Sequence, residues 1–149
     1  MERADKDLAF MLQYENIAWF SDGKVKILDR RVYPRKVESV VCSSYHDVAR
    51  AIRDMVTQSA GPYTAAAAGM ALAAYECRNE SEAKQRDILC DAALCLSTAR
   101  PTTSRRMSLI TRGCLDAAFK AMEAGENVCD SIVRYTVQIN DMRYNKVYK

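Results

Sequence analysis

Residues 61–75 read GPYTAAAAGMALAAY and form the longest weakly polar stretch of the chain, dominated by alanine. Alanine is the strongest helix former, and a proline at the second position suits the first turn of a helix. Because its side chains are so small, neighbouring elements can approach such a helix closely, and we expect it at the centre of the fold. A membrane span needs about 18 or more apolar residues, whereas this run is shorter and is interrupted by Thr64 and Gly69.

The sequence before this helix has the period of strands. On either side of Asp22-Gly23 lies a short run of apolar residues, some alternating with lysine. Asp-Gly between two such runs is a strong hairpin signal, because both turn residues tolerate a positive φ. Residues 37–42 predict a third strand. We therefore expect a small antiparallel sheet within residues 14–42, preceded by an arm or short helix over residues 1–13.

Helical spacing begins at residue 43. Ser44 and Asp47 fit a capping box, in which two side chains satisfy free backbone N–H groups at the helix start. The apolar residues of this helix fall on one face: Val48, Ile52, Met55 and Val56. After the alanine-rich helix, Asn79 and Glu82 fit a second capping box, for a helix that runs to about Thr98.

Two further helices complete the chain. The Arg-Pro step at 100–101 breaks the preceding helix, Thr102 or Thr103 can cap the next one, and Gly125 suits its C-terminal end. Asn127 opens a last helix, whose apolar face includes Met142. Strands first and helices after predict an α+β fold: a small three-stranded antiparallel sheet followed by a bundle of about five helices within 43–149.

Composition fits this fold and excludes other classes. The chain has 149 residues, which suits a single domain. Hydrophobic residues make up 49% and charged residues 28%, so the chain can bury enough apolar surface to fold and is not disordered. Lysine and arginine number 22 against 19 aspartates and glutamates, and a net charge of +3 is too small to indicate a nucleic-acid-binding protein.

Six cysteines are scattered along the chain, mostly within apolar runs. No Cys-x-x-Cys pair occurs and His46 is the only histidine, so we expect no zinc site and no other cofactor. The charged first residues do not resemble a secretory leader, which favours reduced thiols and a cytoplasmic protein. Cys90 and Cys95 lie far from His46 in the sequence, so structural thiols are favoured over a catalytic nucleophile.

Two breaks between helices carry residues that suit an anion. Residues 57–64, TQSAGPYT, are mostly small and polar and run directly into the N-terminus of a helix. Backbone N–H groups and the helix dipole at such an end attract phosphate. Residues 96–107, LSTARPTTSRRM, place Arg100, Arg105 and Arg106 beside another helix start, and arginine binds phosphate through a charged, bidentate fork. The alternative for each segment is an ordinary capped turn. If the two loops meet in space, each strengthens the other.

The chain resembles the N-terminal domain of the 5-methylthioribose-1-phosphate isomerases in three quoted segments. These are ENIAWFSDGKVKILDRRVYP at 15–34, VESVVCSSYHDVARAIRDMVTQSAGPYTAAAAGMALAAYE at 37–76 and LSTARPTT at 96–103. Those isomerases are related to the regulatory subunits of initiation factor 2B and to ribose-1,5-bisphosphate isomerase. The resemblance covers about residues 15–145, and its segments follow in the family's order.

The resemblance implies a part in converting an aldose 1-phosphate to a ketose 1-phosphate, in methionine salvage. In that family, a Cys and an Asp of a C-terminal Rossmann-like domain carry out the step between C1 and C2, so we expect no activity from this chain alone. The N-terminal domain contributes phosphate and sugar contacts from its two loops. The site residues that the resemblance implies here are Gln58, Ser59, Ala60, Gly61, Arg100, Thr102 and Arg105.

Two positions depart from the family pattern. The family's first loop resembles Arg-Gly-Ala-Pro-Ala, and Gln58 stands at its arginine, where a neutral amide cannot replace a guanidinium as a charge partner. Arg105 and Arg106 stand where Asn-Leu is usual. The expected partners are a phosphosugar and a Rossmann-like domain or separate chain, in a homo- or hetero-oligomer. The alternative is a regulatory or scaffold module like the initiation factor 2B subunits, which binds a partner protein and can take a phosphorylated small molecule as effector.

Overall fold

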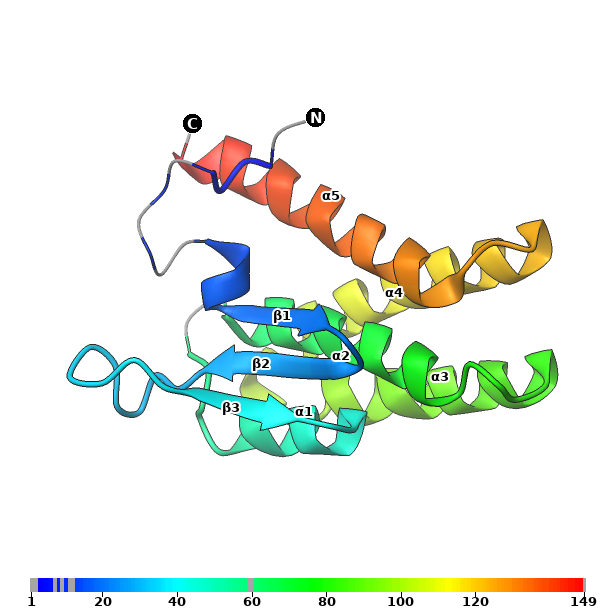
Figure 1. Cartoon of the computed structure of the whole chain (residues 1–149), viewed down its shortest axis with the longest axis horizontal. Coiled ribbons are helices and arrows are strands. Elements are labelled where there is room, and N and C mark those ends of the chain that lie inside the picture. Colours follow the sequence, from blue (N-terminus) through cyan, green and yellow to red (C-terminus); the bar gives the residue numbers. More distant parts are fainter. Residues whose placement is uncertain (1–2, 7, 9, 11–12, 59–60, 149) are drawn as a thin grey trace.

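The computed structural model describes residues 3–6, 8, 10, 13–58 and 61–148 (Figure 1). Its strands are β1 (Ala18–Ser21), β2 (Lys24–Leu28) and β3 (Ser39–Cys42). Its α-helices are α1 (Tyr45–Arg53), α2 (Gly61–Glu76), α3 (Glu82–Ser97), α4 (Ser104–Ala124) and α5 (Val128–Tyr148). Short 3₁₀ turns precede β1 at Tyr14–Asn16 and α4 at Pro101–Thr103. The predicted α+β fold is confirmed.

The sheet is an antiparallel meander in the order β1-β2-β3. Asp22 and Gly23, with φ of 53° and 74°, form the turn between β1 and β2, as the Asp-Gly pair predicts. Along β2, exposed lysines alternate with the buried Val25 and Ile27, which face the helices. β3 is shorter than the expected 37–42, because Val37 lies in the preceding loop and is 64% exposed.

The alanine-rich helix α2 is the centre of the fold, as expected. It contacts the other four helices and the strands β1 and β2. A Cβ atom added at Gly69 would lie 2.9 Å from Leu96 Cδ1 and 3.1 Å from Val48 Cγ1, so α3 and α1 lie too close to admit another carbon unchanged. Small side chains therefore set the spacing of the bundle. Among the described helices, none is long and apolar enough to cross a membrane.

Three of the predicted helix ends are confirmed. The Ser44 hydroxyl accepts a hydrogen bond from the Asp47 backbone N–H at 3.2 Å. Gly125 ends α4 with a φ of 70°, a conformation in which glycine has no Cβ to strain. The Asn127 side chain accepts from the Asp130 N–H at 2.9 Å at the start of α5. These ends depend on local chemistry, which is why the sequence predicts them.

Three local predictions are wrong. Asn79 does not cap α3; Ser81 does, and its hydroxyl accepts from the Lys84 N–H at 3.3 Å. Met55 does not continue the buried face of α1, because the helix has already ended and Met55 has a φ of 64° and is 46% exposed. Met142 on α5 is 69% exposed, because the bundle leaves that side of the helix uncovered.

The N-terminal segment packs on the last turns of α5 (Figure 1). Ala4, Tyr14 and Tyr144 form a small buried cluster there. The Tyr14 hydroxyl donates to Asp141 Oδ1 at 2.5 Å, and the Ala4 backbone N–H donates to the same oxygen at 2.9 Å. Burial, followed by the Asp141 carboxylate, raises the pKa of Tyr14. The first and last parts of the described chain are therefore joined.

Candidate functional site

The two loops chosen from the sequence meet in space, and Arg100 joins them. Its Nη2 donates to the carbonyl oxygen of Ile52 at 2.5 Å and to that of Thr57 at 3.0 Å. The first acceptor lies at the end of α1 and the second begins the loop that leads into α2. Arg100 itself lies between α3 and α4, so one guanidinium links three segments of the chain.

The loop before α2 is closed tightly on itself. The Gly61 N–H donates to the Gln58 carbonyl at 3.0 Å, and Gln58 Nε2 donates to the Met55 carbonyl at 3.2 Å. A Cβ atom added at Gly61 would overlap Thr57 Oγ1, so a larger residue there would displace the Thr57 side chain. Ser59 and Ala60, two of the predicted site residues, lie outside the described residues.

The start of α2 offers fewer N–H donors than an open helix N-terminus. Gly61 has already donated its N–H within the loop, and Pro62 has none. Both residues are buried. The main contribution of α2 to this end of the molecule is therefore its helix dipole, rather than a set of free N–H donors.

A third segment, at Arg30 after β2, contacts the other side of the loop, and no sequence motif indicates it. The Arg30 N–H donates to the Val56 carbonyl at 2.7 Å. Arg30 also lines a cavity of about 10 Å³ with Thr57, which is room for about one water molecule and not for a sugar. Next to it, the Arg31 guanidinium donates to both carboxylate oxygens of Asp29, at 2.9 and 3.0 Å, and lowers the pKa of that carboxyl.

The remaining predicted residues follow Arg100 along the chain. Thr102 and Arg105 are exposed, in the 3₁₀ turn and the first turn of α4. Thr103 stands at the predicted cap position of α4, but its hydroxyl donates to the Arg100 carbonyl at 3.3 Å instead of capping the helix. Arg100 Nε is buried and has no hydrogen-bond partner among the described residues.

This end of the molecule is suited to an anion and not to acid–base chemistry. Arg30, Arg100 and Arg105 bring positive charge to it, whereas the nearby carboxylate of Asp29 is already paired with Arg31. Across the described residues, no group of three or more His, Cys, Asp or Glu side chains could hold a metal ion. The arrangement concentrates positive charge at this end of the molecule, which can attract an anion.

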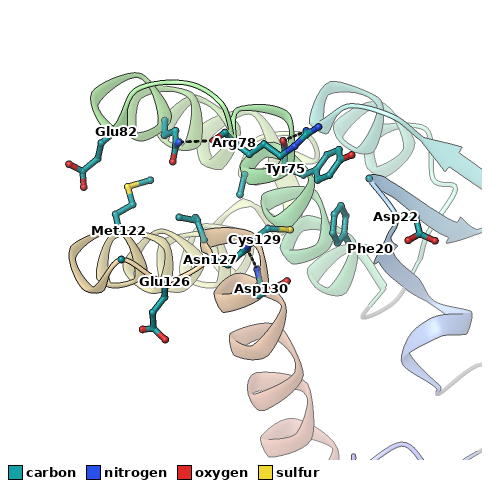
Figure 2. A pocket seen from close by; sticks show the side chains of 15 residues that line it. Phe20, Asp22, Tyr75, Arg78, Glu82, Met122, Glu126, Asn127, Cys129 and Asp130 are labelled. Carbon is teal, nitrogen blue, oxygen red and sulfur yellow. Dashed lines mark hydrogen bonds between the residues drawn. The ribbon is translucent and has the colours of Figure 1, made fainter.

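A cavity of about 710 Å³ lies at the opposite end of the bundle (Figure 2). Its walls are the β1–β2 turn, the end of α2, the start of α3 and the α4–α5 turn. Its charged lining residues are Asp22, Arg78, Glu82, Glu126 and Asp130. Four carboxylates against one arginine repel a phosphate. Sequence reasoning missed this cavity because its lining comes from four separate segments that share no motif.

One sequence argument about the thiols is overturned. His46 and Cys95 are far apart along the chain, yet α1 and α3 bring His46 Nδ1 to 3.8 Å from Cys95 Sγ. Burial, followed by the Asp91 carboxylate, raises the pKa of the Cys95 thiol. All six cysteines are free, as expected.

Comparison with known proteins shows the family. No protein-family model matches the chain. A methylthioribose-1-phosphate isomerase of Natranaerobius thermophilus is 32% identical over 133 residues, which make up 87% of this chain and 38% of that protein. One from Roseiflexus sp. is 36% identical over 104 residues, 67% of this chain and 29% of that protein. The chain belongs to the methylthioribose-1-phosphate isomerase and initiation factor 2B family.

Solved structures agree with the N-terminal domain of this family. The delta subunit of translation initiation factor 2B from A. fulgidus matches 88% of this chain with a TM-score of 0.67 and 26% identity. The 5-methylthioribose 1-phosphate isomerase of Pyrococcus horikoshii shares the fold, with a TM-score of 0.62 and 23% identity. The chain spans 36% of each of these two proteins, so it accounts for little more than a third of their length.

Proposed function

We propose that this chain forms one wall of a phosphosugar site in a cytoplasmic aldose–ketose isomerase of the methylthioribose-1-phosphate type. The observation that supports it is the Arg100 clamp, by which we mean the two hydrogen bonds from Arg100 Nη2 to the Ile52 and Thr57 carbonyls. This clamp joins the two loops that the sequence selects for an anion. An aldose 1-phosphate carries two negative charges near neutral pH, and arginine side chains at a helix N-terminus complement them. Gly61, Thr102 and Arg105 would shape this wall beside Arg100, together with Gln58, Ser59 and Ala60.

The step between C1 and C2 of the sugar needs groups that move hydrogen, and this wall presents cations and amides instead. We therefore propose that the catalytic Cys and Asp come from a Rossmann-like domain, on the same polypeptide or on a partner in a homo- or hetero-oligomer. None of the six cysteines here takes that role. The chain alone binds the phosphate and does not turn the sugar over.

Calorimetric titration of the purified chain tests the binding half of this proposal. We expect 5-methylthioribose 1-phosphate to bind and unphosphorylated 5-methylthioribose not to bind. Gln58→Arg restores a cation to the loop and should tighten binding about tenfold to a hundredfold, since one charge-assisted hydrogen bond contributes about 1.5–3 kcal/mol. Arg112→Gln, at an exposed arginine farther along α4, is the matched control. Equal affinity for the two sugars would overturn the phosphate role.

An isomerase assay tests the catalytic half. The chain alone should give no ketose 1-phosphate, as followed by the appearance of the ketose carbonyl. Turnover by the chain alone would contradict a second, catalytic part.

The second candidate is a regulatory or scaffold module like the initiation factor 2B subunits. The observation that favours it is Gln58, which removes the positive charge of the first loop. The two candidates differ in their partner: an isomerase half binds a Rossmann-like chain with a Cys and an Asp, and a scaffold binds a different protein. Identification of the partner that co-purifies with the tagged chain distinguishes them.

A further inference from the structure

A thiol and an imidazole face one another between α1 and α3. His46 lies in the first turn of α1, and Cys95 lies near the end of α3, with 3.8 Å between Nδ1 and Sγ. Cys95 is half-buried against the core, whereas His46 is exposed. A small molecule can therefore approach the pair from the side of the imidazole.

The imidazole is held in place by its neighbour. The ring of Tyr45 packs on the ring of His46 with 4.2 Å between centroids. Tyr45 is fixed at both ends: its hydroxyl donates to Asp91 Oδ2 at 2.6 Å, and its backbone N–H donates to Glu76 Oε1 at 2.8 Å. The orientation of His46 toward Cys95 is thus supported by α2 and α3.

The other five cysteines lack this arrangement. Cys42, Cys77 and Cys114 are buried, and the Cys129 thiol donates to the Ala71 carbonyl at 3.4 Å. Cys90 is exposed on the same helix as Cys95, but His46 is the only histidine of the chain and it faces Cys95. Only Cys95 combines partial access with a base in contact.

We propose that Cys95 is a modification site, at which a small neutral electrophile such as hydrogen peroxide reacts with the thiol while His46 accepts the proton. Sγ attacks one peroxide oxygen, an S–O bond forms and the O–O bond breaks. The sulfur is oxidised by two electrons to a sulfenic acid, and the peroxide is reduced. The thiol proton passes through Nδ1 of His46, in the tautomer with Nε2 protonated, to the leaving hydroxide, which departs as water.

The surroundings of Cys95 explain why the base is needed. Burial and the Asp91 carboxylate raise the pKa of the thiol, and the Arg53 guanidinium opposes them only in part. At neutral pH, the resting group is therefore a thiol rather than a thiolate, and it reacts when its proton has an acceptor within reach. Cys90 has no imidazole beside it and serves as an internal reference.

Alkylation kinetics of the full chain test the proposal. Iodoacetamide labels the native protein at neutral pH, and peptide mass spectrometry gives separate rates for Cys95 and Cys90. In His46→Gln, the rate at Cys95 should fall about tenfold or more, as expected for loss of a general base, and the rate at Cys90 should stay unchanged. Arg50→Gln, at an exposed position of α1, is the matched control and should change neither rate.

Oxidation gives a second readout. After treatment with hydrogen peroxide, dimedone should trap sulfenic acid at Cys95 ahead of Cys90 in the wild type, and this preference should disappear in His46→Gln. Equal Cys95 rates in the wild type and in His46→Gln would overturn the role of His46. Oxidation of Cys90 ahead of Cys95 in the wild type would overturn the site itself, and this comparison needs no variant.

Discussion

In Arg100→Met, the side-chain stem keeps most of its length, but the guanidinium that joins α1 to the following loop is lost. Arg100 Nη2 donates to the Ile52 carbonyl at 2.5 Å and to the Thr57 carbonyl at 3.0 Å. A hydrogen bond to a charged group contributes about 1.5–3 kcal/mol, so two of them contribute roughly 3–6 kcal/mol at full burial. Arg100 is only half-buried, and solvent weakens such bonds. We expect the free energy of unfolding to fall by about 2–4 kcal/mol.

Thermal and urea unfolding, followed by circular dichroism, measure this loss. For a chain of this size, 1 kcal/mol corresponds to roughly 2–4 °C, so the melting temperature should fall by about 5–15 °C. Arg105→Met is the matched control, because Arg105 is an exposed arginine in the same segment. It should change the free energy of unfolding by less than about 0.5 kcal/mol.

Amide hydrogen exchange shows where stability is lost. Two backbone bonds close the clamped loop: Gly61 N–H donates to Gln58, and Arg30 N–H donates to Val56. Both amides should exchange faster in Arg100→Met than in the wild type, relative to amides within α4. An Arg100→Met protein as stable as the Arg105→Met control would refute the reasoning. So would a destabilised variant whose two loop amides stay as protected as in the wild type.

Three further outcomes follow from the packing. Gly69→Ala places a methyl group 2.9 Å from Leu96. The resulting strain should exceed the gain in helix propensity and lower the free energy of unfolding by about 1 kcal/mol in urea titrations. A higher free energy of unfolding in the variant would contradict this. Burial raises the pKa of Cys114 to about 12, so the unfolded thiol ionises first and stability should be full below about pH 8.5 and fall as pH rises toward 12. Urea midpoints that stay level between pH 9 and 11 would contradict this, and Cys114→Ala should reduce the slope. Asp141→Ala removes the acceptor of the Tyr14 hydroxyl and should speed exchange of the N-terminal amides while β2 stays protected; unchanged exchange there would be the contrary result.

Features that depend on a few neighbouring residues could be predicted from the sequence. Asp-Gly at 22–23 needs only the local preference for positive φ, and the end of α4 needs only Gly125. Met55 could not be placed, because its apolar side chain continues the pattern of α1 while the chain turns away to reach the loop held by Arg100. Asn79 and Ser81 are both good caps, and the spacing alone does not choose between them.

Only part of the candidate site can be predicted from the sequence. The residue types in both loops select Arg100 as a binding residue, but its two acceptors are backbone carbonyls, which every residue has. No sequence signal therefore reveals the clamp. The contact between Cys95 and His46 is hidden for a related reason, because it depends on how α1 crosses α3 and not on spacing along the chain.

The bond between Tyr14 and Asp141 has a consequence for how the protein is made. Its two residues are 127 positions apart, and ribosomes add roughly 5–20 residues per second, so the N-terminal segment waits roughly 6–25 s before its acceptor has been synthesised. The hairpin and α1 to α3 can form on their own contacts during that interval. The segment around Tyr14 thus reaches its final place only well after it has been synthesised.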